Sequence, residues 1–395
     1  MERSTYIWIF VISFAVVLSG SMIYFILFSE KKGPIASPEN VENLEECGVV
    51  KYSGEDAINV VFFSSKEDAE EYVDYFLDVV PFNEEEYKDK FNFFFIDSYE
   101  PGCEIYRGIA LLCDQKEVTK KAASCPHDYL VVLQEKPSSI RSSAYMNVMS
   151  LNSIHPKTVL MHEWGHVFAD FAEEYVDNQA KIPRGSKNCQ GNCDDFDGAK
   201  DGCFEGCTKN SYFRSVENGV MKTLTPDSGV MYGLFNENTI RKRIEEELSS
   251  LLSRVTGSIS LVTGSAVADF EDCENQKYYL AEFEYEDCFN LVSEEIVAGC
   301  PGGVGSGGFK YSLIGEYGKS ILDKGFDPTK FYAEGPGEKD ENGYATIESG
   351  GVERPKTFVI QAPIAEGIDK LNLLDETGCD VEINLRNMGA RACKT

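Results

Sequence analysis

Two histidines and a glutamate stand at a spacing that suits metal chemistry. His162, Glu163 and His166 form a His-Glu-x-x-His motif within residues 155–177. On a helix, positions four apart lie on one face about one turn from each other, so both imidazoles can reach one ion. Neutral imidazole is a common zinc ligand, and the intervening carboxylate can act as general base toward a metal-bound water. The motif predicts one catalytic zinc ion; the alternative is a buried helix that carries two histidines by chance.

A catalytic zinc site needs a third protein ligand, and acidic residues follow the motif. Glu173 lies seven residues after His166, about 10 Å along a straight helix, which is too far for one ion. The helix must therefore end or bend, although Ala169 and Asp170 stand where a glycine would mark the turn. We rank Glu173 first, Glu174 second and Asp170 third as the ligand. The alternative is that the two glutamates form a solvated acidic patch.

Residues 57–255 alternate between apolar runs and amphipathic segments. Pro156 and an apolar repeat of roughly 3.6 residues predict a helix around the motif. Further amphipathic helices are predicted at 68–78 and 236–254. Buried strands are predicted at 58–63, 91–96 and 129–133, and an edge strand at 144–151. This order predicts an α/β domain whose mixed sheet packs against the motif helix.

The character of the sequence changes at about residue 256. Short strand-like runs separated by Gly-rich or acidic turns occupy 256–395, and no long helical period appears. The runs lie at 258–262, 278–285, 309–317, 357–361, 370–374 and 381–385. They predict an all-β, sandwich-like domain. Because this part contains no histidine, we do not expect it to hold the catalytic metal.

The N-terminus carries an uncharged apolar run. Residues 6–28 are long enough to cross a membrane as a helix. A cleaved signal peptide is the competing interpretation, but its apolar core is usually shorter, and no small-x-small cleavage site follows closely. We therefore expect a tail at 1–5, a transmembrane anchor at 6–28 and a polar linker at 29–56.

Thirteen cysteines indicate an oxidising compartment outside the cytoplasm. Four of them lie in the irregular segment 183–214, at Cys189, Cys193, Cys203 and Cys207. Two Cys-x3-Cys pairs could hold a structural metal ion, but the many other cysteines favour two disulfides that staple this loop. The odd total leaves at least one cysteine free, paired between chains or bound to metal.

The chain is strongly acidic. It has 37 Lys+Arg residues against 66 Asp+Glu among 395 residues, a formal net charge of −29. Such a surface repels nucleic acids and anionic lipid headgroups, so we expect a protein or peptide substrate and no nucleic-acid partner. Nothing in the sequence indicates an oligomeric state.

Two Gly-Val-Met triplets follow the cysteine-rich segment and end at Met221 and Met231. A methionine in a tight turn beneath the metal is a feature of one branch of zinc peptidases, and either residue could fill that role. Packing in the core is the alternative. Tyr232 follows the second triplet and is a candidate for stabilising an oxyanion.

Residues 162–175 (HEWGHVFADFAEEY) resemble the zinc helix of the IgA-peptidase family of metallopeptidases, where Asp-Glu-Tyr ends a short stretch after the two histidines. Residues 214–221 (RSVENGVM) are similar to the segment that carries the family's Met-turn, which favours Met221 over Met231. The similarity covers about residues 57–255. Other segments in the family's order are INVVFF at 58–63, Pro81-Phe82, FNFFFID at 91–97 and HDYLVVL at 127–133.

The resemblance implies a zincin-like fold and an exported or surface-bound zinc endopeptidase, with His162 and His166 as ligands and Glu163 as the base. Glu173 replaces the family's Asp, and Asp170-Phe171 replaces its Gly-Leu, so the departures concern the third ligand. Together, the residues and the resemblance predict a membrane-anchored, extracytoplasmic zinc endopeptidase. The alternatives are a catalytically inactive zincin-like surface binding or adhesion protein, and an anchored structural protein whose two histidines are core residues.

Overall fold

The computed structural model describes residues 44–177, 182–183, 185–196, 201–256, 270–348 and 352–386. The predicted tail and anchor at 1–28 and the predicted strand at 258–262 lie outside the described residues. Within the part of the chain that is described, no helix is both long and apolar enough to cross a membrane.

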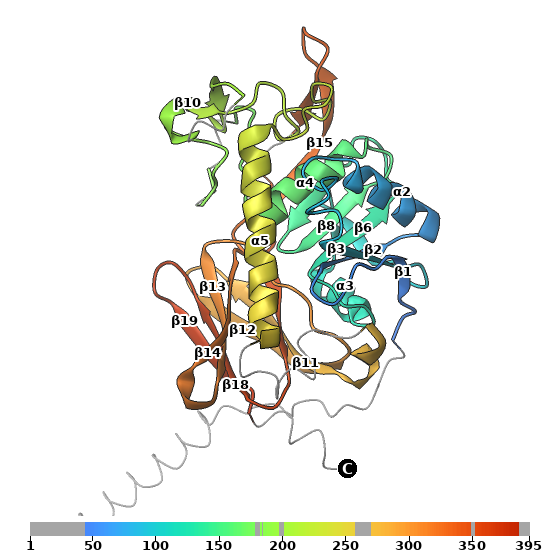
Figure 1. Cartoon of the computed structure of the whole chain (residues 1–395), viewed down its shortest axis with the longest axis vertical. Coiled ribbons are helices and arrows are strands. Elements are labelled where there is room, and N and C mark those ends of the chain that lie inside the picture. The colour runs from blue at the N-terminus through green and yellow to red at the C-terminus, as the bar shows by residue number, and fades with distance from the viewer. Residues whose placement is uncertain are drawn as a thin grey trace, which may run out of the picture. The chain divides into compact units, whose positions relative to one another are not determined.

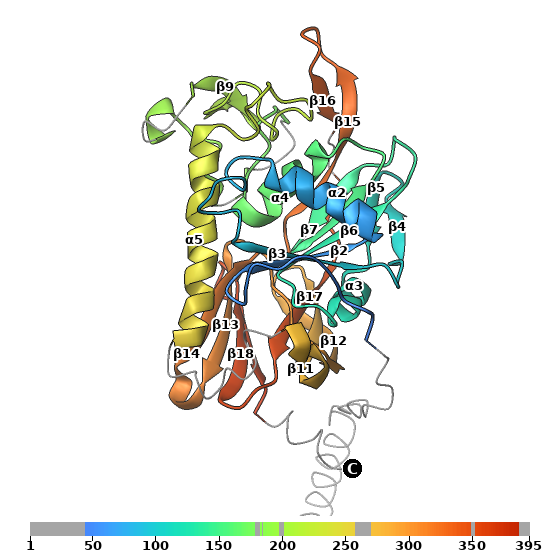
Figure 2. The ribbon, with the colours of Figure 1, turned by 45° about the vertical axis from the view of Figure 1, so that its right-hand side comes forward.

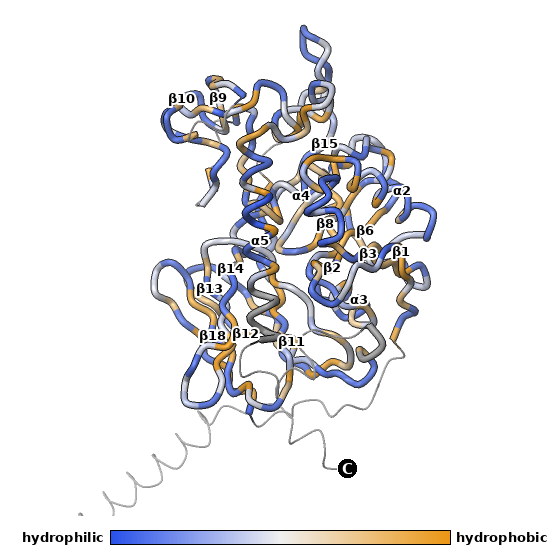
Figure 3. The backbone as a smooth tube through the Cα atoms, viewed as in Figure 1, coloured by the Kyte–Doolittle hydropathy of each residue, from blue (hydrophilic) through white to orange (hydrophobic). Residues whose placement is uncertain are grey.

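An eight-stranded mixed sheet forms the centre of the α/β part of the molecule (Figure 1). Strands β2, β3, β6 and β8 run parallel, whereas β1, β7, β15 and β16 pair antiparallel. The central strands are nearly continuous hydrophobic runs (Figure 3), as expected for parallel strands buried on both faces. In spatial order the strands are β1 (Gly48–Lys51), β3 (Phe91–Ile96), β2 (Ile58–Phe63), β6 (Tyr129–Gln134), β8 (Val148–Asn152), β7 (Ser142–Tyr145), β15 (Phe331–Lys339) and β16 (Ala345–Glu348).

Helices cover both faces of this sheet (Figure 2). Helices α2 (Lys66–Leu77) and α4 (Thr158–Ala169) pack on one face, and α3 (Gln115–Ala122) packs on the other. Successive strand residues point to opposite faces, so Phe62 joins the core under α2 and α4 while Phe63 joins the core under α3. The motif helix therefore lies directly on the sheet, as predicted.

Helix α5 (Leu234–Thr256) connects the two halves of the described chain (Figure 1). Arg243 on α5 donates to the Phe168 carbonyl of α4 at 3.2 Å. One turn later, Glu247 pairs at 3.2 Å with Lys324 of strand β14 (Ser320–Phe326). The remaining small elements are the hairpins β4 (Cys103–Tyr106) with β5 (Ala110–Cys113) and β9 (Phe204–Cys207) with β10 (Lys209–Arg214), and short 3₁₀ helices at Cys193–Phe196, Phe270–Asn275 and Glu316–Gly318.

The predicted strands at 58–63 and 91–96 and the predicted helix at 236–254 are confirmed as β2, β3 and α5. The prediction of one edge strand at 144–151 is wrong. That run spans β7 and β8, which form an antiparallel pair around Met146, a residue with a positive φ of 56°. Strand β8 lies inside the sheet between β6 and β7.

Two antiparallel sheets make up most of the chain after α5, which confirms the predicted β character of this part. Aromatic and aliphatic side chains of both sheets, including Phe283, Phe326 and Phe358, share one core. One sheet contains β12 (Phe289–Ala298), β11 (Lys277–Tyr285) and β17 (Thr357–Pro363), and the other contains β14 (Ser320–Phe326), β13 (Phe309–Gly315), β18 (Ile368–Leu374) and β19 (Asp380–Asn384).

Strands β15 and β16 leave these two sheets and join the large sheet instead. Residues Phe331 to Glu334 of β15 pair antiparallel with Tyr145 to Ser142 of β7. The large sheet thus contains residues from both sides of the predicted domain boundary near 255. The division of the chain into a domain at 57–255 and another at 256–395 stays a prediction.

Six disulfides link cysteines of the described residues, which points to an extracytoplasmic protein. In the segment 183–214 the bridges are Cys189–Cys207 and Cys193–Cys203, so the disulfide prediction is confirmed and a structural metal on these four cysteines is excluded. Cys393 lies outside the described residues. The other bridges are Cys47–Cys125, Cys103–Cys113, Cys273–Cys300 and Cys288–Cys379.

Candidate metal centre

Helix α4 presents both motif histidines to one buried point. Its apolar face packs on the sheet around Trp164 and Phe168, and this packing decides which way the opposite face points. The Nε2 atoms of His162 and His166 lie 3.1 Å apart. Both rings are almost fully buried, so the predicted helical register does bring the two imidazoles together.

Main-chain carbonyls set the orientation of both rings. Nδ1 of His162 donates to the Val220 carbonyl at 2.9 Å, and Nδ1 of His166 donates to the Phe171 carbonyl at 2.7 Å. A carbonyl oxygen only accepts, so each neutral ring carries its proton on Nδ1 and a lone pair on Nε2. Two such lone pairs facing each other repel unless a proton or a cation lies between them. Hydrogen bonds of this kind also hold the rings of metal-bound histidines.

The chain reverses direction directly after α4. Asp170 has φ 56° and ψ 31°, a left-handed conformation that ends the helix. The N–H groups of Asp170 and Phe171 both point back to the Gly165 carbonyl, which closes the helix C-terminus. Aspartate tolerates this conformation better than most residues other than glycine. The turn that the sequence does not mark with a glycine is therefore made by Asp170.

This reversal returns Glu173 to the two histidines. Its carboxylate oxygens lie 3.1 Å from Nε2 of His166 and 3.5 Å from Nε2 of His162. The side chain is buried, and neither oxygen has a hydrogen-bond partner. The first-ranked candidate ligand thus joins the histidine pair.

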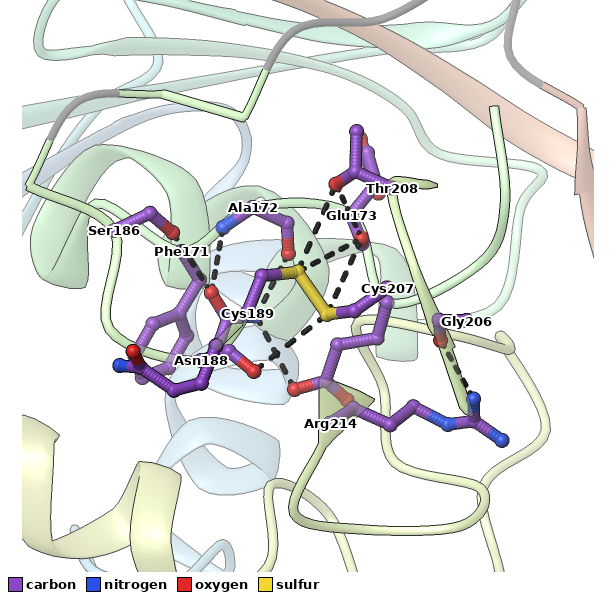
Figure 4. The surroundings of a disulfide bond; sticks show 12 residues. Phe171, Ala172, Glu173, Ser186, Asn188, Cys189, Gly206, Cys207, Thr208 and Arg214 are labelled. Atoms are coloured by element: carbon purple, nitrogen blue, oxygen red, sulfur yellow. Dashed lines mark hydrogen bonds between the residues drawn. A yellow bond between two sulfur atoms is a disulfide. The ribbon is translucent and has the colours of Figure 1, made fainter. Parts of the chain in front are cut away.

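The segment 183–214 holds the main chain around Glu173 in place (Figure 4). The Asn188 side chain accepts from the N–H of Ala172, the residue before Glu173, at 2.8 Å and donates to the Ala172 carbonyl at 2.7 Å. The Thr208 hydroxyl donates to the Glu173 carbonyl at 2.7 Å, and the Cys189–Cys207 bridge packs against the same oxygen. The cysteine-rich segment therefore fixes the backbone that carries this carboxylate.

The lower-ranked candidates point elsewhere. Glu174 is fully buried and accepts from Asn188 at 3.2 Å and from Asn236 at 2.8 Å, while burial raises its pKa to about 7. The Asp170 carboxylate accepts from Lys330 Nζ at 2.9 Å. Neither belongs to the group of side chains that could share an ion. The alternative of a solvated acidic patch is wrong, because Glu173 and Glu174 are both buried.

Glu163 is fully buried beside this group, and neither of its carboxylate oxygens has a hydrogen-bond partner. Burial raises the pKa of Glu163 to about 8; attraction to His162 opposes this rise, and repulsion from Glu173 adds to it. A buried carboxylate without partners is costly, and perturbed groups of this kind are typical of functional sites.

The nearby carboxylates favour a positive charge on, or between, the two histidine rings. Burial lowers the pKa of His162, but the nearby charges of Glu173 and Glu163 outweigh it and raise the pKa to about 9. For His166, the effect of burial outweighs the attraction to Glu173, so its pKa lies below the usual value. Although burial raises the pKa of Glu173, attraction to the two histidines holds it well below its usual range. A proton on one ring or a cation between the donors can supply the charge.

Met221 lies beneath α4 at Gly165. A Cβ on Gly165 would come within 2.5 Å of Met221 Sδ, so the close approach of methionine and helix requires the glycine. The Met221 carbonyl also accepts from the N–H of Glu174 at 2.9 Å. Met231 is half-buried, and its carbonyl accepts from Val220 at 2.7 Å. The structure thus places Met221, not Met231, against the motif helix.

Tyr232 does not have a free hydroxyl for an oxyanion. The hydroxyl donates to the main-chain carbonyl of Met161 in α4, and the side chain is fully buried. Burial also raises the pKa of Tyr232 well above its usual range. The residue supports the helix, which corrects its predicted role.

Strand β15 adds a fourth donor from the C-terminal part of the chain. Glu334 joins His162, His166 and Glu173 in a buried group whose ligand atoms all lie within 4.8 Å of one another. Tyr332, on the same face of the strand, stacks on the His166 ring with centroids 3.6 Å apart. We did not expect the histidine-free C-terminal part to hold the catalytic metal, yet it contributes Glu334 to this group. No sequence signal singled out Glu334, because residues 331–339 were not predicted to form a strand.

No protein-family model matches the sequence, and no curated protein matches it significantly. The candidate site is therefore defined by its geometry. Two imidazole nitrogens and two carboxylates converge in a buried position, and a further carboxylate without partners adjoins them. This donor set can hold a metal ion.

Proposed function

We propose that the protein is an extracytoplasmic zinc endopeptidase with a zincin-like fold. The observation that carries the proposal is the convergence of the His162 and His166 Nε2 atoms with the Glu173 carboxylate, whose oxygens have no hydrogen-bond partner. Such a set of donors is favourable when it surrounds a cation. The resemblance of residues 162–175 to the zinc helix of the IgA-peptidase family supports the same assignment.

His162, His166 and Glu173 would hold the zinc ion, which when bound polarises a substrate carbonyl and lowers the pKa of water. Glu163 accepts the proton of the water that attacks the scissile carbonyl and then delivers it to the leaving amine. Burial and the lack of hydrogen-bond partners support this role, because both carboxylate oxygens of Glu163 are left available to accept that proton. Two main-chain carbonyls accept from the Nδ1 atoms of both rings, which leaves the Nε2 atoms as the ligand atoms that would face the ion.

The same proposal includes the compartment of the enzyme, its membrane anchor, its C-terminal domain and its class of substrate. Six disulfides support a position outside the cytoplasm, and we propose that residues 6–28 anchor the protein in the membrane. The two C-terminal sheets with their shared core support a sandwich-like domain. The net charge of −29 favours a protein or peptide substrate over a nucleic acid.

The substitution Glu163→Gln in the full-length protein tests the proposal. We expect zinc content near one ion per chain and a loss of peptide hydrolysis of about 10²–10⁴-fold, the usual contribution of a general base. Glu135→Gln, an equal charge change at an exposed position, is the matched control and should match the wild type. Zinc is measured by elemental analysis and hydrolysis with a quenched fluorescent peptide library. Zinc binding without cleavage by the wild type or any variant would instead identify a binding protein.

A further inference from the structure

Four protein donors converge where a catalytic zinc site normally has three. His162, His166, Glu173 and Glu334 share one buried position, and four protein ligands are typical of structural zinc. Yet Glu163 beside them is a buried carboxylate without partners, which a structural site does not need. The two features are compatible if one of the four donors exchanges with water.

Glu334 is the donor with the weakest support. The histidines belong to a helix packed in the core, and the backbone of Glu173 is held by Asn188 and the Cys189–Cys207 bridge. Glu334 lies on β15, whose backbone pairing with β7 consists of four residue pairs, and Tyr332 is the side chain of this stretch that packs on the core around α4. Strand β16 pairs with β15 only from Gly335 onward, so among the described strands β7 alone pairs with the stretch at the site.

The same strand covers the histidines. The Tyr332 ring lies parallel to the His166 ring, with an interplanar angle of 8°. The Tyr332 hydroxyl and one Glu334 carboxylate oxygen are buried without hydrogen-bond partners. Both groups would gain hydrogen bonds to water if the strand moved outward, so the closed position is stabilised less than its close packing suggests.

Contacts at both ends define the part of the chain that can move. Before the strand, Lys330 donates to Asp170 at 2.9 Å, and after the turn, the N–H of Ala345 donates to Thr225 at 2.7 Å. Phe331 packs against Tyr106 and Tyr145, and the Tyr344 hydroxyl donates to Asp227 at 2.5 Å. Residues 332–343 lie between these contacts, and in Figure 2 the β15–β16 hairpin extends beyond the edge of the large sheet. We call residues 332–343 the strap.

We infer that the strap regulates access to the metal site. Glu334 occupies the coordination position that water has to take, and the strap moves outward with Tyr332 and Glu334 when a peptide enters. The exchange moves the Glu334 carboxyl group away from Glu163 and Glu173. This inference rests on the proposed zinc chemistry and adds a mechanism that controls when water and peptide reach the zinc ion.

Cobalt-substituted full-length protein tests the strap without relying on hydrolysis. Azide binds at a free coordination position and changes the visible absorption of Co²⁺. We expect Glu334→Ala to bind azide at least ~10-fold more tightly than the wild type, because water or azide no longer competes with the carboxylate. Glu338→Gln, an equal change in charge at an exposed position of the same strand, is the matched control and should match the wild type.

Peptide hydrolysis gives the second readout. The kcat/KM of the zinc-loaded Glu334→Ala variant should rise by ~10-fold or more over the wild type. Glu334→Gln, which keeps the side-chain volume, should shift both readouts in the same direction and replaces the alanine variant if that variant does not fold. Unchanged azide affinity, or a joint fall in metal content and kcat/KM, would overturn the inference. Tighter azide binding with no hydrolysis by any variant would support the strap and refute the peptidase proposal.

Discussion

Helix α4 and strand β15 approach the same buried position from opposite parts of the chain, and they are held there very differently. The helix packs on the large sheet through Trp164 and Phe168, and its end is closed by the Asp170 turn. The strand reaches the site through four residue pairs with β7 and leaves the Tyr332 hydroxyl without a hydrogen-bond partner.

The difference separates a permanent from a removable part of the site. Packing in a core is lost only on unfolding, whereas a strand that pairs with one neighbour and has an exposed C-terminal end can open locally at a much smaller free-energy cost. Permanent donors suit the binding of an ion, and a removable donor suits control of its reactivity. Substitutions at ligands in both regions and at Asp170, which belongs to both, test this distinction, and His127 tests a separate contact of the large sheet.

The largest effect is expected from His166→Ala. Removal of a helix-borne ligand should weaken zinc binding by more than the ~10–100-fold that is typical for the loss of an outer hydrogen-bond partner. Glu334→Ala, on the removable side, should keep zinc within ~10-fold of the wild type if three ligands suffice. Competition with a chelator measures both affinities. His155→Ala, at a buried histidine bonded to the Ser138 carbonyl, is the control and should retain zinc. Equal losses in His166→Ala and Glu334→Ala would remove the distinction between the two regions.

An intermediate effect is expected from Asp170→Ala, because Asp170 belongs to both regions. Its backbone makes the left-handed turn after α4, and its carboxylate accepts from Lys330, which anchors the chain just before the strap. Loss of both features should lower the free energy of unfolding by about 1–3 kcal/mol in urea titrations. Asp170→Gly relieves the strained backbone and should recover about 1 kcal/mol of that loss. If the alanine and glycine variants are equally stable, the left-handed conformation contributes nothing.

The smallest effect is expected from His127→Gln, which removes a pH-dependent contact between the large sheet and the C-terminal sheets. His127 is buried, donates from Nδ1 to the Cys125 carbonyl at 2.9 Å, and lies against Gly302, where an added Cβ would approach its Nε2 to 2.2 Å. Burial lowers the pKa of His127, although Asp128 and the Cys125 carbonyl oppose this shift.

Since the folded protein disfavours the imidazolium, the unfolded chain takes up a proton first as the pH falls below about 6.5. The contribution to stability is therefore complete above that pH and is lost below it, by up to roughly 1.4 kcal/mol per pH unit. Urea titrations between pH 7.5 and 5.5 should show a shallower decline for His127→Gln than for the wild type. Parallel declines would show that another group is responsible.

Short-range patterns made a large part of the fold predictable. Strands β2 and β3 were predicted at both ends because buried parallel strands are continuous hydrophobic runs, and α5 was predicted from its amphipathic period. Strands β7 and β8 were merged into one prediction, since the turn between them depends on a positive φ at Met146. Strand β15 was not predicted; its run contains glycine and proline, and its partner β7 lies far away in the sequence.

The sequence by itself determined the pairing of His162 and His166, because four residues on a helix always span about one turn. It also determined the oxidising setting, through the number of cysteines. Only the tertiary structure decided that Asp170 turns the chain so that Glu173 returns, and that Glu334 arrives from β15. The physical reason is range: helix geometry links close neighbours, whereas these two carboxylates depend on a helix end and on a strand pairing that contacts from distant segments stabilise.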